Sequence, residues 1–203
     1  MPVLQVAGGT AITSKKNWPT ARLRLLAACV ATAGLAVDFG TKVLAIAALD
    51  PAHPVPILGG LVVFRLTRNS GAAFSMGEGF TLGLTIIAII ALVGVVGWLL
   101  PRVRHVGWAV GTGLLLAGIA GNLADRLFRE PSPFHGHVVD FIQLPYFAII
   151  NVADICITAA AVVIIWLTIF TQVSPAGTRY KDASDVPKES VVQEASDVQD
   201  ARG

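Results

Sequence analysis

The chain alternates four long apolar stretches with shorter polar segments. A bilayer core of about 30 Å is crossed by about 20 helical residues, because each adds 1.5 Å. Four stretches reach that length, at residues 25–49, 81–100, 106–124 and 147–170. This pattern predicts an all-α integral membrane protein with four transmembrane helices.

The polar segments predict the rest of the organisation. Residues 61–66 form an apolar, β-prone run after two glycines, which predicts one or two short strands in an extracytoplasmic loop. Residues 1–24 are predicted to be a cytoplasmic N-terminal segment. Residues 171–203 are rich in Ser, Asp, Glu and Gln, and are predicted to be a disordered cytoplasmic tail. The membrane domain would therefore span residues 25–170.

Composition supports the membrane assignment and narrows the possible chemistry. Of the 203 residues, 54% are hydrophobic and 14% are charged, whereas about 25% are charged in soluble domains. No basic patch interleaved with aromatic residues indicates a nucleic-acid partner. Cys29 and Cys156 are expected near opposite membrane faces, so no disulfide is predicted. The histidines lack the spacing of a zinc-binding HExxH motif, and we predict no metal site.

Basic residues predict the orientation of the spans. Arginines and lysines are enriched in cytoplasmic loops, and nine flank one side of the predicted spans against four on the other. The nine are Lys15, Lys16, Arg22, Arg24, Arg102, Arg104, Arg179, Lys181 and Lys188, and the four are Arg65, Arg68, Arg126 and Arg129. Both termini are therefore expected in the cytoplasm, with residues 50–80 and 125–146 on the outer face.

Two aspartates on that outer face are the main candidates for chemistry. Asp154 lies eight residues into the predicted span 147–170, about 10 Å below its edge, and Asp140 enters from the preceding loop. An ionisable group inside a span costs at least a few kcal/mol, which suggests a function. Two neighbouring carboxylates cannot both ionise easily, so one serves as base and one as acid. Spacing alone also allows two separate structural acids at helix ends.

Other polar residues in the apolar body allow two interpretations each. Asp38 and Lys42 are four residues apart on one helix face, where they form a structural ion pair or shape a substrate site. Asn69 and Gly71 belong to a turn-rich string after the predicted strand. This string is either a simple hairpin turn or a place where the Asn69 amide holds a peptide backbone.

A second polar group closes the third predicted span. Asn122, Asp125 and Arg126 share one helix face, and bracing of the outer mouth is the favoured role. A carboxylate held by an arginine has a depressed pKa and is a poor acid, so Asp125 is not a preferred catalytic residue. Asn151 and Asp154 are three residues apart and share a face of the fourth helix.

Five short strings occur in this order: Asp38-x-x-Thr41-Lys42, Asn69-x-Gly71-x-Ala73-Phe74, Gly121-Asn122-x-x-Asp125-Arg126, Val138-Val139-Asp140-Phe141 and Asn151-x-Ala153-Asp154. Together they resemble the bacterial lipoprotein signal peptidase (signal peptidase II) family. The resemblance covers roughly residues 25–170. It implies an aspartic endopeptidase of the bacterial inner membrane that cuts prolipoproteins just before a diacylglyceryl-modified cysteine.

The resemblance also implies roles for individual residues. Asp140 and Asp154 match the catalytic pair, and no metal or organic cofactor is implied. Prolipoproteins and membrane lipid are the implied partners, and a monomer is sufficient. The alternative from another class is a small transporter or ion-conducting protein that uses the intramembrane Asp and Lys groups. The supporting or substrate-contacting positions are Asp38, Lys42, Asn69, Gly71, Asn122, Asp125, Arg126 and Asn151.

Overall fold

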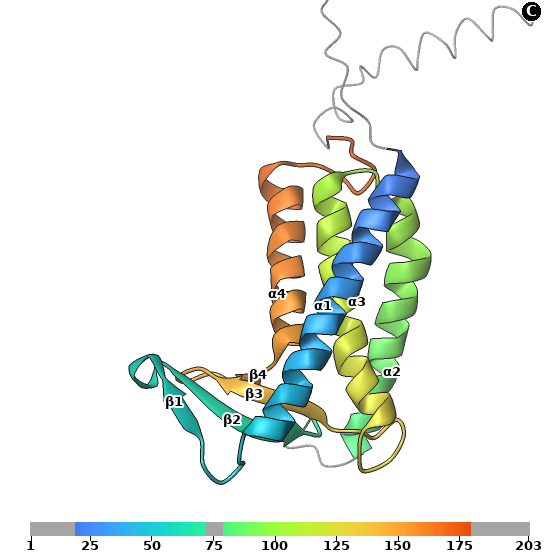
Figure 1. Ribbon diagram of the computed structural model, residues 1–203. Coiled ribbons are helices and arrows are strands. Elements are labelled where there is room, and N and C mark those ends of the chain that lie inside the picture. The colour runs from blue at the N-terminus through green and yellow to red at the C-terminus, as the bar shows by residue number, and fades with distance from the viewer. Residues whose placement is uncertain (1–18, 72–78, 180–203) are drawn as a thin grey trace, which may run out of the picture.

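The computed structural model describes residues 19–71 and 79–179, which form four long helices and a small sheet (Figure 1). All four helices are long and apolar enough to cross a membrane, so the predicted fold class is confirmed. The helices are α1 (Thr20–Ala48), α2 (Gly79–Gly94), α3 (Val106–Phe128) and α4 (Val152–Ile165). Helix α2 continues through a π-helical turn and a 3-10 turn to Arg102, and α4 continues through a π-helical turn to Phe170.

Two helix boundaries differ from the sequence prediction in ways that matter for the site. Helix α3 extends to Phe128, so Asp125 lies inside a helix rather than beyond its end. Helix α4 begins at Val152, later than the predicted start at residue 147, because Asn151 caps it. The apolar residues before this cap look helical by hydropathy alone, but they form a turn and a short strand.

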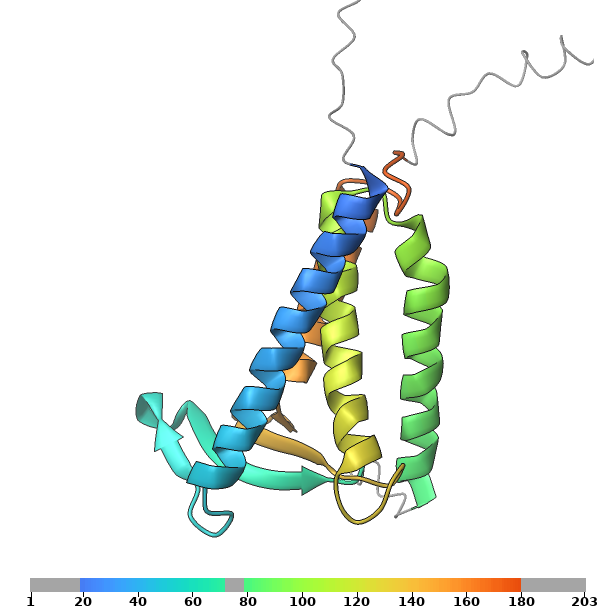
Figure 2. The same ribbon diagram turned by 45° about the vertical axis from the view of Figure 1, so that its right-hand side comes forward.

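Helix α3 is the centre of the bundle, since α1, α2 and α4 each pack against it (Figure 2). Glycines allow the closest approaches. A Cβ added at Gly113 would lie 2.6 Å from the carbonyl oxygen of Ala27 on α1. One added at Gly118 would lie 2.5 Å from the carbonyl oxygen of Ala153 on α4. Small residues let helices pack backbone to backbone in lipid.

A four-stranded antiparallel sheet crosses the helix ends where α1 finishes and α4 begins (Figure 1). The sequence predicted one or two strands in the first outer loop, and it placed Asp140 on a loop. Instead, Asp140 lies on a strand, opposite Thr67. The strands, in sheet order, are β1 (Val55–Ile57), β2 (Val62–Asn69), β3 (Val138–Gln143) and β4 (Ile149–Ile150).

The opposite end of the bundle is closed by a small apolar core. Leu23 and Val103 are fully buried there, and the indole of Trp108 donates a 2.9 Å hydrogen bond to the carbonyl of Val173. Residues 171–179, which the sequence assigned to the tail, instead fold back as a turn in which Val173 bridges Arg179. The rest of the predicted tail, and residues 1–18 of the N-terminal segment, lie outside the described residues.

Candidate active site

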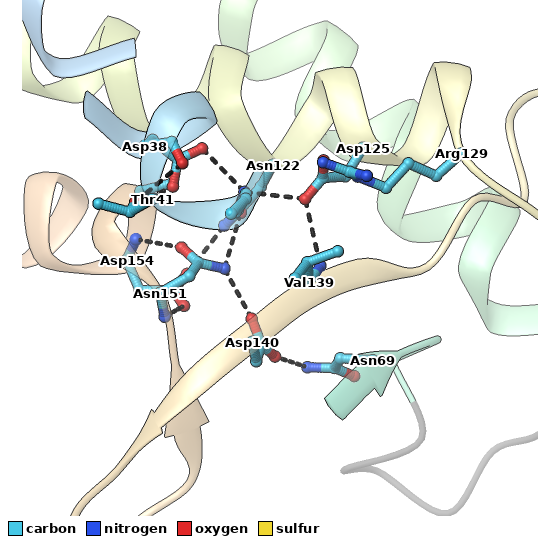
Figure 3. Close-up of polar contacts among 12 residues, drawn as sticks. Asp38, Thr41, Asn69, Asn122, Asp125, Arg129, Val139, Asp140, Asn151 and Asp154 are labelled. Atoms are coloured by element: carbon cyan, nitrogen blue, oxygen red, sulfur yellow. Dashed lines mark hydrogen bonds and ion pairs between the residues drawn. The ribbon is translucent and has the colours of Figure 1, made fainter. Parts of the chain in front are cut away.

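Asp140 lies at the junction of the sheet and the helices, and amide groups hold both of its oxygens (Figure 3). The side-chain nitrogen of Asn69, on β2, donates to Asp140 Oδ2 at 2.9 Å. The side-chain nitrogen of Asn151 donates to Asp140 Oδ1 at 2.6 Å. Only 2% of Asp140 is exposed. The strand pairing of β2 with β3 is what brings Asn69 and Asp140 together, although they are 71 residues apart.

Asp154 is fixed by the helix cap at the start of α4. The Asn151 side chain accepts a hydrogen bond from the Asp154 backbone N–H at 3.0 Å, and Asp154 Oδ2 accepts from the Asn151 N–H at 3.1 Å. This reciprocal arrangement is a capping box. The other oxygen, Oδ1, accepts from the Asn122 amide at 2.8 Å. Asp154 therefore lies in the first turn of its helix, not two turns inside a span as the sequence predicted.

Asn151 connects the two carboxylates. Its side-chain nitrogen donates to Asp140, and its backbone nitrogen donates to Asp154. The same side-chain nitrogen also donates to Asn122 Oδ1 at 3.1 Å, and Asn151 is completely buried. Because the residue is buried and its donors are all used, it has little freedom to rotate. One residue thus sets the positions of both candidate catalytic groups.

Lys42 organises a second group of carboxylates beside this pair. Its ammonium lies 2.8 Å from Asp38 Oδ2, 2.8 Å from Asp125 Oδ2 and 3.1 Å from Asn122 Oδ1. A lysine has three donors, and here each has an acceptor. The predicted pair between Asp38 and Lys42 is present, and Asp38 Oδ1 also accepts from the N–H of Ala153 at 2.8 Å. The group joins α1, α3 and the start of α4.

Asp125 extends this group towards the sheet. Its Oδ1 lies 2.5 Å from Arg129 Nε, and its Oδ2 accepts from the N–H of Val139 at 3.2 Å. The sequence indicated Arg129 only as a basic residue of the outer face, although its spacing of four residues from Asp125 on one helix was a usable signal for this ion pair. Arg126 is placed differently, because its buried Nη1 has no hydrogen-bond partner among the residues described.

Gly71 acts on the site through Asn69. Its N–H donates to Asn69 Oδ1 at 2.8 Å, which leaves the amide nitrogen directed at Asp140. Gly71 has a φ of 98°, a backbone conformation that side chains other than glycine rarely adopt. The remainder of the predicted string, residues 72–74, lies outside the described residues.

The two groups of carboxylates differ in whether a cation lies close enough to form an ion pair. Burial raises the pKa of Asp140 to about 6, and the negative charge of Asp154 also raises it, against hydrogen bonds from Asn69 and Asn151. Within residues 19–71 and 79–179, the ion pairs within 4.0 Å include Asp38 and Asp125 but neither Asp140 nor Asp154. A carboxylate pair without a cation can retain one proton near neutral pH. The described part of the chain contains no cluster of three His, Cys, Asp or Glu residues suited to a metal ion.

Comparison with known proteins identifies the family. The sequence model of Signal peptidase (SPase) II matches residues 30–170, which hold every candidate residue above. The chain belongs to the signal peptidase II family. It is 47% identical over 161 residues to the lipoprotein signal peptidase of Mycobacterium avium (strain 104), covering 79% of this chain and 87% of that protein. It is 44% identical over 160 residues to the lipoprotein signal peptidase of Rhodococcus jostii (strain RHA1), covering 79% and 80%.

Solved structures agree with this membership. Two structures described as bacterial membrane enzymes, at 1.9 and 2.3 Å resolution, each align with a TM-score of 0.62. Their identities are 26% and 25%, and they cover 75% and 77% of this chain and 96% and 92% of their own. The protein is therefore a multi-pass membrane peptidase, and the transporter alternative is not favoured.

Proposed function

We propose that this signal peptidase II is an aspartic endopeptidase that removes the signal peptide from diacylglyceryl-modified prolipoproteins, cutting just before the lipidated cysteine. The names of the relatives, which are lipoprotein signal peptidases, support the substrate class. One observation carries the catalytic assignment. Asn151 holds Asp140 and Asp154 together, and both carboxylates bond to amide donors rather than to a cation.

The first chemical step uses the difference between the two carboxylates. Asp140 is the more buried and keeps the shared proton, whereas the partly exposed Asp154 is the base. Asp154 removes a proton from water as the water oxygen bonds to the scissile carbonyl carbon. Asp140 gives its proton to the carbonyl oxygen, which yields a neutral gem-diol.

The second step breaks the peptide bond. The amide nitrogen takes the proton that Asp154 acquired from water, and it leaves as the amine when the C–N bond breaks. One gem-diol hydroxyl returns its proton to Asp140 as the carbonyl of the new carboxylic acid forms. Asp140 is then protonated and Asp154 ionised, as at the start of the cycle. No metal or organic cofactor takes part.

Supporting residues keep this pair in place. Asn69, Asn122 and Asn151 orient the carboxylates through their amides. Lys42 supplies a positive charge near the pair without contacting either member, since its ammonium bonds to other groups. Arg126, with its unused buried donor, is available to a substrate carbonyl.

The protein's placement in the membrane is part of the proposal. Arginines lie at the helix ends opposite the carboxylate pair, and the positive-inside rule supports a cytoplasmic location for both termini. The pair then lies near the outer leaflet of the bacterial inner membrane, within reach of water and of a lipid-anchored substrate. A monomer contains all the groups that the reaction uses.

Charge-removing substitutions test the catalytic pair. Asp140→Asn and Asp154→Asn are each expected to lower kcat for a lipidated precursor by about 10³-fold or more, because an amide can serve neither as base nor as acid. Asp50→Asn is the matched control, since Asp50 is exposed and lies outside the site. Near-normal turnover by either purified variant would show that the pair is not catalytic.

Substrate lipidation is tested separately. The full-length protein in detergent is given one precursor with and without its diacylglyceryl group. We expect cleavage of the lipidated form only, before the modified cysteine. Equal rates on both forms would contradict lipid-dependent recognition while leaving the catalytic pair intact.

A further inference from the structure

The helix ends farthest from the active site carry exposed arginines, and we call them the basic end. They lie at the start of α1, in the connection from α2 to α3, and after α4 (Figure 1). All the aspartates and glutamates in the described ranges lie elsewhere, and the nearest on α1, Asp38, is about 20 Å along the helix from Arg24. The basic end consists of Arg22, Arg24, Arg102, Arg104 and Arg179.

Two of these arginines join α1 to the connection between α2 and α3. Arg24 Nη2 lies 3.5 Å from the carbonyl oxygen of Pro101, and Arg104 Nη1 donates to the hydroxyl of Thr20 at 2.7 Å. Each contact uses one donor and a neutral acceptor. Among residues 19–71 and 79–179, no carboxylate pairs with either arginine, so both guanidinium charges are available to an anion there.

Arg102 is held in a similar way at the end of the α2 span. Its guanidinium donates to the carbonyl oxygen of Trp98 at 2.5 Å and lies over the Trp98 ring, 4.7 Å from the centroid. Trp98 itself is 62% exposed. A tryptophan beneath an arginine is typical of the level where headgroups meet acyl chains.

Helix dipoles add to the positive potential. Helices α1 and α3 both begin at the basic end, at Thr20 and Val106, and neither has an acidic residue in its first turn. The N-terminal end of a helix carries a partial positive charge and favours anions. Among the described residues, the charged side chains near these helix starts are arginines, so the local electrostatics favour an anion.

We propose that the basic end binds the phosphate headgroup of an anionic phospholipid in the adjacent leaflet. The lipid is favoured over free phosphate because exposed apolar side chains, Leu25 and Trp98, lie beside Arg24 and Arg102 and provide a surface for acyl chains. The headgroup phosphate then offsets the arginine charges and the two helix dipoles together. This site is remote from the catalytic pair and goes beyond the proposed function.

Native mass spectrometry of the full-length protein tests the site directly. The protein is titrated with phosphatidylglycerol and with phosphatidylcholine of the same acyl chains. We expect phosphatidylglycerol to bind more than about tenfold more tightly, with an affinity that falls as salt is raised. The variant Arg102→Gln/Arg104→Gln should lose about fivefold in phosphatidylglycerol affinity for each arginine removed, with phosphatidylcholine binding unchanged.

Two control variants distinguish the loss of arginine charge from a general effect on folding. Arg102→Lys/Arg104→Lys keeps the charges and should keep most of the preference, and Arg65→Gln removes an exposed arginine on the sheet and should change nothing. Equal affinity of the wild type for both lipids overturns the proposal, whether or not the variants fold. Displacement of the lipid by an equal concentration of inorganic phosphate, or an equal loss in Arg65→Gln, also overturns it.

Discussion

Four buried or partly buried aspartates meet at one end of this bundle, but they belong to two different environments. Asp38 and Asp125 face the ammonium of Lys42 at 2.8 Å each. Asp140 and Asp154 are held by asparagine amides instead. Under the proposed function, the first pair braces the fold and the second transfers protons, so the partner of a carboxylate distinguishes the two roles better than its residue type or depth.

The two environments differ in how well the negative charges of the carboxylates are balanced by nearby cations. In the Lys42 group, the two carboxylates are balanced by two cations, Lys42 and Arg129, so the group has no net charge. The amide-held pair has no such balance, so its members compete for a proton. The four predictions below test this contrast, from the largest expected effect to the smallest.

Removing the shared cation should damage the fold most. Lys42→Met leaves Asp38 and Asp125 buried without their common partner, and breaking a buried ion pair by removing one member costs about 3–5 kcal/mol. We expect a lower midpoint of thermal unfolding in detergent and a lower yield. Adding Asp38→Asn to Lys42→Met should recover part of the loss. Wild-type stability of the single variant would contradict a bracing role.

Asp140 should contribute to the pH dependence of stability. Burial raises the pKa of Asp140 from 3.8 in the unfolded chain to about 6 in the fold. The stability from neutral Asp140 is therefore complete below pH 3.8 and is lost as the pH rises through 6, by about 3 kcal/mol. Asp140→Asn should remove this part of the dependence in thermal unfolding from pH 4 to pH 7. An identical dependence in the wild type and the variant would show that Asp140 is not the buried titrating group.

Asp125→Asn should separate bracing from catalysis. Lys42 keeps Asp38 as a counter-ion in this variant, and the new amide oxygen can still accept from Val139. We expect a loss of about 1–3 kcal/mol in stability, with measurable turnover of the lipidated precursor. An inactive Asp125→Asn together with an active Asp140→Asn would mean that the two groups have been assigned the wrong way round.

The smallest effect should be a shift in the pH profile of kcat/KM. The Asn69 amide donates to Asp140 and favours its ionised form, so Asn69→Ala should raise the pKa of Asp140. Because Asp140 is the proposed proton donor, the falling limb of the profile should move to higher pH. Arg65→Gln, an exposed change on the same strand, is the control. A falling limb that stays in place would exclude Asn69 as a partner of the catalytic acid.

The sequence was most informative where the signal is local. Hydropathy located four spans, because burial in lipid demands about 20 apolar residues in a row. Spacing along a helix paired Asp38 with Lys42. It was less reliable around Asp154, because the apolar residues before Asn151 satisfy a helix by hydropathy but pair as a strand.

The two environments of the aspartates arise only from the tertiary structure. The partners of Asp140 are Asn69, 71 residues away on a paired strand, and Asn151, across the start of α4. Asp125 bonds to Lys42 on a different helix, a contact that the sequence did not predict. The sequence alone determines the residue types and the membrane spans. Packing between distant segments decides which carboxylate pairs with a cation and which accepts from an amide. No local sequence pattern predicts these partners.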